Sequence, residues 1–208
     1  MKQLCALALL LVLNTGVLAE SFAERVLANL WGRSAIPSNP ESFPEGFLGI
    51  KWGSSKKAAI TAMLAREGVT LNNQARDEWE LGFDGGSFGE KPVDRITIVF
   101  VNDQMASADV GFAQPKNERF DAQSPTLRHW VVALTSKYGK SPDLDYANPV
   151  EGLKKGLTWT YLSNSIKLTN ELGKGVHIIY VYGTLYDQLP KLIEQQRLKK
   201  STPPPTDY

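Results

Sequence analysis

Cysteine is almost absent from this chain, since Cys5 is the only one among its 208 residues. Cys5 lies in an apolar run near the start, within a segment that we predict is cleaved off. The mature protein would then have no disulfide and no thiol nucleophile, which excludes disulfide-rich scaffolds and cysteine enzymes. A bacterial periplasm suits such a chain, because disulfides are allowed there but not required.

Histidine is nearly as scarce, with only His129 and His177. No pair of histidines or cysteines has the spacing of a transition-metal site. Asp143-x-Asp145 begins like a calcium loop, but Lys154 stands where such a loop needs a glutamate. No glycine-rich segment joins a strand to a helix with a phosphate-binding pattern. We therefore predict no metal and no cofactor. On the strand around residues 176–182, His177 is expected on the less buried face.

The chain has no excess charge of either sign. It has 23 basic and 22 acidic residues, and Lys2 is the only charged residue among the first 19, so 22 of each sign would remain after cleavage. A neutral protein has no general electrostatic attraction to nucleic acid. We expect no nucleic-acid partner.

The first 19 residues have the three parts of a secretory signal peptide. Lys2 precedes the apolar run Leu4–Leu13, and a more polar exit ends in Val17 and Ala19. Cleavage after Ala19 would deliver a periplasmic or secreted protein without a transmembrane span. A membrane anchor is the alternative, although the apolar run is short of the ~20 residues that span a bilayer.

Proline and glycine divide the rest of the chain. Residues 20–42 are predicted to form a short N-terminal helix and a Pro-rich linker. Residues 43–198 are predicted to form one α+β domain of two halves, 43–120 and 121–198. Residues 199–208, with three successive prolines, are expected to be a disordered tail.

Each half begins with an amphipathic helix followed by three strands. Ser54 or Ser55 caps the first helix, and Ser124 caps the second, which Gly139 ends. The apolar face of an amphipathic helix must pack against another apolar surface. We therefore predict a largely antiparallel sheet with helices on one face, plus a C-terminal helix. The predicted strands lie near residues 79–83, 96–101, 104–112, 157–161, 166–168 and 176–182.

Aromatic residues in predicted loops are the candidate binding residues. Trp79, Trp130 and Trp159 fall on the apolar phase of their elements and are expected in the core. Trp52, Phe88 and Tyr146 fall in loops, where an exposed ring could bind a partner.

Two serine motifs bear on catalysis. Gly85-x-Ser87-x-Gly89 matches the nucleophile pattern of serine hydrolases, with Asp143 or Asp145 and His177 as possible partners, but the pattern requires a strand that turns into a helix. Ser54-x-x-Lys57 matches a motif of penicillin-recognising enzymes whose companion Lys-Thr-Gly is missing. We assign no catalytic residue and keep a small Ser87 hydrolase as an alternative.

Short motifs resemble known envelope proteins. Phe47-Leu48-Gly49-Ile50-Lys51-Trp52-Gly53-Ser54-Ser55-Lys56-Lys57 resembles the entry to a helix in small uncharacterised periplasmic proteins of Gram-negative bacteria. Leu134–Lys140, then Trp159 and Ile166-x-Leu168, resembles their second half. The layout is similar to outer-membrane assembly lipoproteins and to the halves of beta-lactamase inhibitory proteins. The chain lacks the lipidated cysteine of the former and the disulfides of the latter. The resemblance therefore implies fold and compartment, and no site residue.

These observations predict a non-enzymatic exported protein that binds an envelope macromolecule, such as an envelope protein or a cell-wall partner. The loops 82–93 and 140–155 are the expected binding platform. A small-ligand carrier with a cleft between sheet and helices is a further alternative.

Overall fold

The computed structural model describes residues 43–72, 77–112, 124–139, 141, 156–171 and 175–201. The predicted signal peptide and the helix and linker of residues 20–42 lie outside the described residues. The same is true of loop 140–155, apart from Ser141, and of the tail from residue 202.

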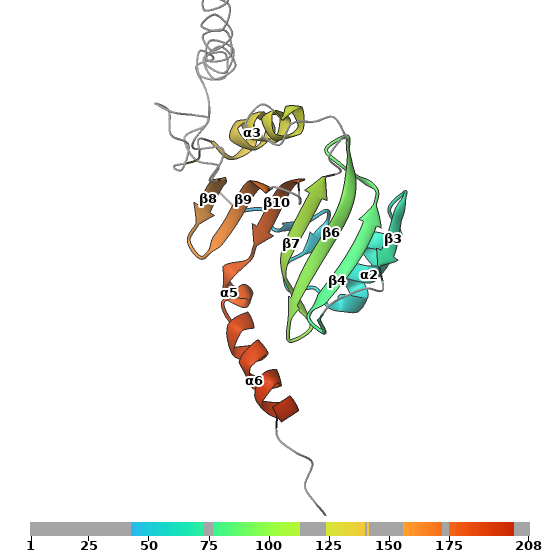
Figure 1. Cartoon of the computed structure of the whole chain (residues 1–208), viewed down its shortest axis with the longest axis vertical. Coiled ribbons are helices and arrows are strands. Elements are labelled where there is room, and N and C mark those ends of the chain that lie inside the picture. Colours follow the sequence, from blue (N-terminus) through green and yellow to red (C-terminus); the bar gives the residue numbers. More distant parts are fainter. Residues whose placement is uncertain are drawn as a thin grey trace, which may run out of the picture.

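One antiparallel sheet organises the described residues, and the α+β fold predicted from the sequence is confirmed (Figure 1). The strands lie in the order β3-β4-β6-β7-β10-β9-β8, and the short strand β5 pairs with β6. Their bounds are Val69–Asn72 (β3), Glu80–Gly85 (β4), Ser87–Phe88 (β5), Lys91–Val101 (β6), Gln104–Phe112 (β7), Leu157–Tyr161 (β8), Asn164–Glu171 (β9) and Gly175–Val181 (β10).

The two halves of the sheet meet at their last strands. β7 ends the first half and pairs antiparallel with β10, which ends the second, from His177↔Gly111 to Val181↔Ser107. The long central strands of both halves are thereby joined into one continuous surface. A small separate hairpin, β1 (Gly46–Phe47) and β2 (Ile50–Lys51), precedes the first helix.

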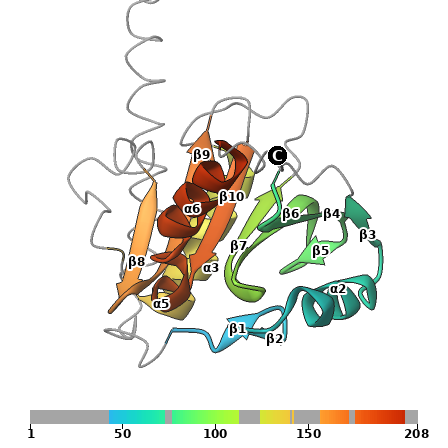
Figure 2. The same cartoon turned by 90° about the horizontal axis from the view of Figure 1, so that it is seen from below.

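Helices α2 (Lys56–Leu64) and α3 (Pro125–Tyr138) enclose the main core against one face of the sheet. Figure 2 shows α2 beside the β3–β7 half and α3 beside the β8–β10 half. Met63, Trp130 and Ile98 are buried there together with Phe83 and Leu168. Each such side chain contributes roughly 1.5–3 kcal/mol by leaving water, which accounts for the stability of this layer.

Helices α5 (Gly183–Tyr186) and α6 (Leu189–Ser201) lie on the opposite face, at one end of the sheet. Leu189 packs with Val101, which the strand alternation turns away from the main core, and with Ala106 at the register shift between β6 and β7. Beyond this contact α6 runs past the end of the strands (Figure 1). Among the described residues, the C-terminal helices therefore leave much of that face without a helix over it.

The structure adds elements that the sequence pattern missed. The first half has the edge strand β3 and the short β5 in addition to three predicted strands, so segment 82–93 is strand and tight turn rather than a loop. The expected last helix is split into α5 and α6, and α6 continues to Ser201, three residues past the predicted boundary.

Candidate functional site

The sheet face opposite α2 and α3 carries two neighbouring rows of polar side chains across its centre. In the first row the strand register aligns Thr70, Asp84, Arg95, Gly111, His177 and Thr169. The second row includes Asn72, Thr97, Asp109 and Lys167, and the start of β4 adds Glu80. We call these residues the polar sheet face.

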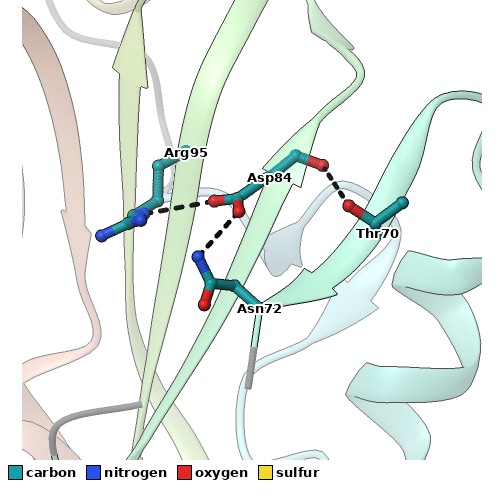
Figure 3. A network of polar contacts seen from close by, with 4 residues as sticks. All are labelled: Thr70, Asn72, Asp84 and Arg95. Atoms are coloured by element: carbon teal, nitrogen blue, oxygen red, sulfur yellow. Dashed lines mark hydrogen bonds and ion pairs between the residues drawn. The ribbon is translucent and has the colours of Figure 1, made fainter. Parts of the chain in front are cut away.

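Asp84 is the centre of a hydrogen-bonded group on this face (Figure 3). One carboxylate oxygen lies 3.3 Å from Arg95 Nε, and the other accepts from Asn72 Nδ2 at 2.7 Å. Thr70 Oγ1 donates to the Asp84 carbonyl at 3.5 Å. The side chains of Arg95 and Asp84 are 52% and 45% exposed. An ion pair so exposed adds little stability, and its geometry directs the Arg95 guanidinium toward Asp84.

His177 and Asp109 form a second oriented pair on the two central strands. His177 Nδ1 lies 2.9 Å from Asp109 Oδ1, and the side chains are 22% and 35% exposed. Glycine at position 111 makes room for the ring, because a Cβ there would lie 3.0 Å from His177 Cε1. His177 therefore lies on the partly exposed face of β10, as the alternation predicts.

A cleft lies at the end of the sheet where α2, the β6–β7 turn and α6 meet. It encloses about 240 Å³ and is lined by Lys56, Glu78, Trp79, Phe100, Asn102, Asp103, Leu192 and Gln196. We call it the Lys56 cleft. Lys56 Nζ donates to the Glu78 carbonyl and lies 5.7 Å from the centre of the Phe100 ring. This site combines carboxylates, an ammonium and aromatic faces.

Two of the three aromatic candidates pack against other rings. Trp52 stacks on Tyr182 with the planes 4° apart and donates from Nε1 to the Pro44 carbonyl at 2.7 Å. Phe88 packs against Phe47 and Trp130 beside the main core. Both rings are half-buried, so the structure gives each a packing role, and a binding role stays a prediction. Tyr146 lies outside the described residues.

Ser87 lies in a setting unlike that of a hydrolase nucleophile. It is exposed in β5, opposite Pro92, and the chain turns from β5 directly into β6 rather than into a helix. Asp143 and Asp145 lie outside the described residues. In the second serine motif, Ser55 rather than Ser54 accepts the capping hydrogen bond, from Ala58 N.

The buried Tyr138 and Tyr180 and the half-buried Tyr161 cluster where α3 meets the sheet. Burial and the neighbouring Tyr138 raise the pKa of Tyr161 to about 12. Burial, the charge of Tyr138 when ionised and a hydrogen bond with its hydroxyl raise the pKa of Tyr180 further above its ordinary value. These hydroxyls stay protonated at neutral pH, so they can donate hydrogen bonds but cannot act as bases.

Among the described residues, no group of three or more His, Cys, Asp or Glu side chains is arranged to hold a metal ion. No helix within those ranges has the length and apolar character needed to cross a bilayer. Compared with known proteins, the chain matches no family model, no curated protein and no solved structure.

The sequence pattern did not reveal the polar sheet face, because Val99 and Val101 make residues 96–101 apolar on both faces of the strand. The available signal was the polar phase of two adjacent strands, Arg95 and Thr97 on β6 and Ser107 and Asp109 on β7. That alternation shows that one side of each strand is polar. Only the pairing register between the strands shows which polar residues are neighbours.

Proposed function

We propose that this protein is exported to the bacterial envelope and binds a partner protein there through the polar sheet face. The observation that supports the proposal most is the pair of oriented groups, Asp84 with Arg95 and Asp109 with His177, on strands of a rigid sheet. Preoriented side chains lose little conformational freedom on binding.

The charge of the face selects the kind of partner. By strand register its described acidic side chains are Glu80, Asp84 and Asp109, and its basic ones are Arg95 and Lys167. An acidic excess favours a partner that presents basic side chains, because complementary charge speeds association and aligns the two surfaces.

Crosslinking in the cells that make the protein tests this proposal. A photoreactive amino acid replaces Thr97, at the centre of the face, or Thr61, which is exposed on α2 at the opposite side. We expect a discrete protein adduct from position 97 and none of the same size from position 61. Equal adducts from both positions, or none from position 97, would count against the proposal.

Matched charge variants sharpen the test. Asp84→Asn should weaken the position-97 adduct, whereas Glu67→Gln, which removes an exposed acid from the turn that follows α2, should leave it unchanged. Export is tested separately by sequencing the N-terminus of the protein recovered from the envelope fraction. The expected first residue is Glu20, and an intact Met1 would refute cleavage.

A further inference from the structure

Strand β6 has a β-bulge near its start, and this bulge places Arg95 on the polar sheet face. Val93 pairs with Phe112 on β7. Arg95 pairs with the next β7 residue, Gly111, so Asp94 is an extra residue in β6. Val93 is buried, whereas Asp94 and Arg95 are both exposed, which breaks the strand alternation. A bulge changes the direction of a side chain at the cost of regular pairing, and here it directs Arg95 to the solvent side.

The Arg95 guanidinium contacts Asp84 through Nε, which leaves its two Nη nitrogens available. Nε donates to Asp84 Oδ1 at 3.3 Å, and neither Nη nitrogen has a hydrogen bond in the part of the chain that the structure describes. Figure 3 shows the Nη end of the side chain pointing away from Asp84. The other Asp84 oxygen accepts from Asn72 at 2.7 Å. Because the Arg95 side chain is 52% exposed, a group from another molecule can reach the Nη end.

The chemistry of this free end favours a carboxylate. The two Nη nitrogens carry parallel N–H donors in one plane, and their spacing matches the two oxygens of a carboxylate. An ammonium group has no such paired donors, so the contact depends on arginine rather than on positive charge alone. A carboxylate placed beside Asp84 or Asp109 instead would meet a like charge. One acidic side chain of a partner can therefore approach this face in one place, which fixes how the two proteins align.

We propose that Arg95 binds the carboxylate of one Asp or Glu side chain of the envelope partner through its two Nη nitrogens. This inference rests on the proposed function, because the partner is the protein that binds the polar sheet face. Basic side chains of that partner supply the general attraction, and the single carboxylate at Arg95 selects the orientation. Arg95 is then a specificity-determining residue, and Asp84 is a positioning residue that acts through it.

The photo-crosslinked adduct from position 97 measures this contact, because residue 97 follows Arg95 on the same face of β6. Arg95→Lys keeps the charge but loses the paired donors, and Arg95→Gln loses both. We expect each to lower the adduct yield about tenfold. Lys57→Gln removes an equal charge from the exposed first turn of α2 and should change the yield less than about twofold. Full yield with Arg95→Lys, or an equal loss with Lys57→Gln, would overturn the proposal.

A double-mutant cycle tests the positioning role of Asp84. Asp84→Asn alone should lower the adduct yield, because it removes the carboxylate that Nε contacts. In the Arg95→Lys background the same change should lower the yield by less than about twofold further, since Asp84 acts through the guanidinium. Losses that multiply would show that Asp84 contacts the partner directly and would overturn its positioning role.

Mass spectrometry of the adduct identifies the partner segment that lies beside Arg95. We expect an Asp or Glu in that segment, and Arg95→Glu combined with arginine at that acid should restore part of the yield that each single change removes. A segment without Asp or Glu would overturn the proposal.

The outcomes separate this inference from the proposed function. No adduct from position 97 in the otherwise unchanged protein would overturn both, whereas an adduct whose yield does not depend on Arg95 would overturn this inference alone. Circular dichroism and thermal unfolding check that each variant is folded. We expect little loss of stability, because the ion pair that the Arg95 variants change is exposed, and Arg95→Lys suffices for the test if Arg95→Gln does not fold.

Discussion

Replacing Gly183 with alanine should destabilise the fold severely, because this residue packs against backbone. A Cβ at position 183 would lie 1.8 Å from the carbonyl oxygen of Ser163, whereas real Cβ contacts essentially never fall below 3.0 Å. The two segments must therefore separate by more than 1 Å. Both are held in place, since Gly183 N donates to Asn164 Oδ1 at 3.0 Å and Tyr182 N donates to the Ala106 carbonyl at 2.8 Å.

The expected loss is about 3 kcal/mol of unfolding free energy, at the upper end of overpacking effects. In urea, with a slope of about 2 kcal/mol/M for a domain of this size, the midpoint should fall by about 1.5 M. Gly49→Ala is the matched control. Its φ of +83° strains an alanine, but nothing lies within 4 Å of the added Cβ. We expect a loss of about 1 kcal/mol there, because unfolded-state entropy offsets part of the strain.

Urea unfolding followed by circular dichroism measures both variants. If Gly183→Ala lowers the midpoint no more than Gly49→Ala does, the close approach of Gly183 to Ser163 is not a constraint of the native fold. A lowered midpoint with an unchanged slope is the expected pattern, because the change acts on the packed state.

Two further predictions concern a buried hydroxyl and an exposed turn. Burial raises the pKa of Tyr180 above 10, the ordinary value that the phenol regains in the unfolded chain. The protonated Tyr180 side chain therefore makes its full contribution to stability below pH 10. Above pH 10 the unfolding free energy falls by up to about 1.4 kcal/mol per pH unit, because the unfolded chain loses the proton first. Tyr180→Phe should make the unfolding free energy depend less steeply on pH in this range, and an unchanged pH dependence would contradict the assignment. Leu162 is fully exposed at the β8–β9 turn with φ +54°, so Leu162→Gly should leave stability equal or up to about 1 kcal/mol higher. Leu162→Val should lower it, because a β-branched residue tolerates positive φ least, and equal melting temperatures for the two variants would argue against strain at this turn.

Local signals predicted α3 well. Its boundaries follow from a serine, a proline and a glycine, and the structure places each as expected. Ser124 Oγ accepts from Leu127 N at 3.2 Å, Pro125 begins the helix, and Gly139 ends it. Such caps act over one helical turn, so they are readable from neighbouring residues alone.

Short and edge elements escaped prediction for a physical reason. β1 and β2 have two residues each, too few to show an alternation, and β3 has four at the sheet edge. Their strand conformation comes from pairing with neighbours rather than from their own pattern. Strand β6 shows the converse, since residues 96–101 are apolar on both faces and predicted a strand inside the sheet, and β6 indeed pairs with β4 on one side and β7 on the other.

The sequence by itself determined the α+β class, the two capped helices and the central strands, because these depend on periodicity and on contacts within a few residues. It also predicted the face of β10 on which His177 lies. Only the tertiary structure decided that Asp84 meets Arg95, that Asp109 meets His177, and that Lys56, Phe100 and Gln196 share one cleft. These groups come from segments far apart in the chain, and their contacts depend on strand order and register. A change of one residue in the register would turn each strand's polar side chains to the other face.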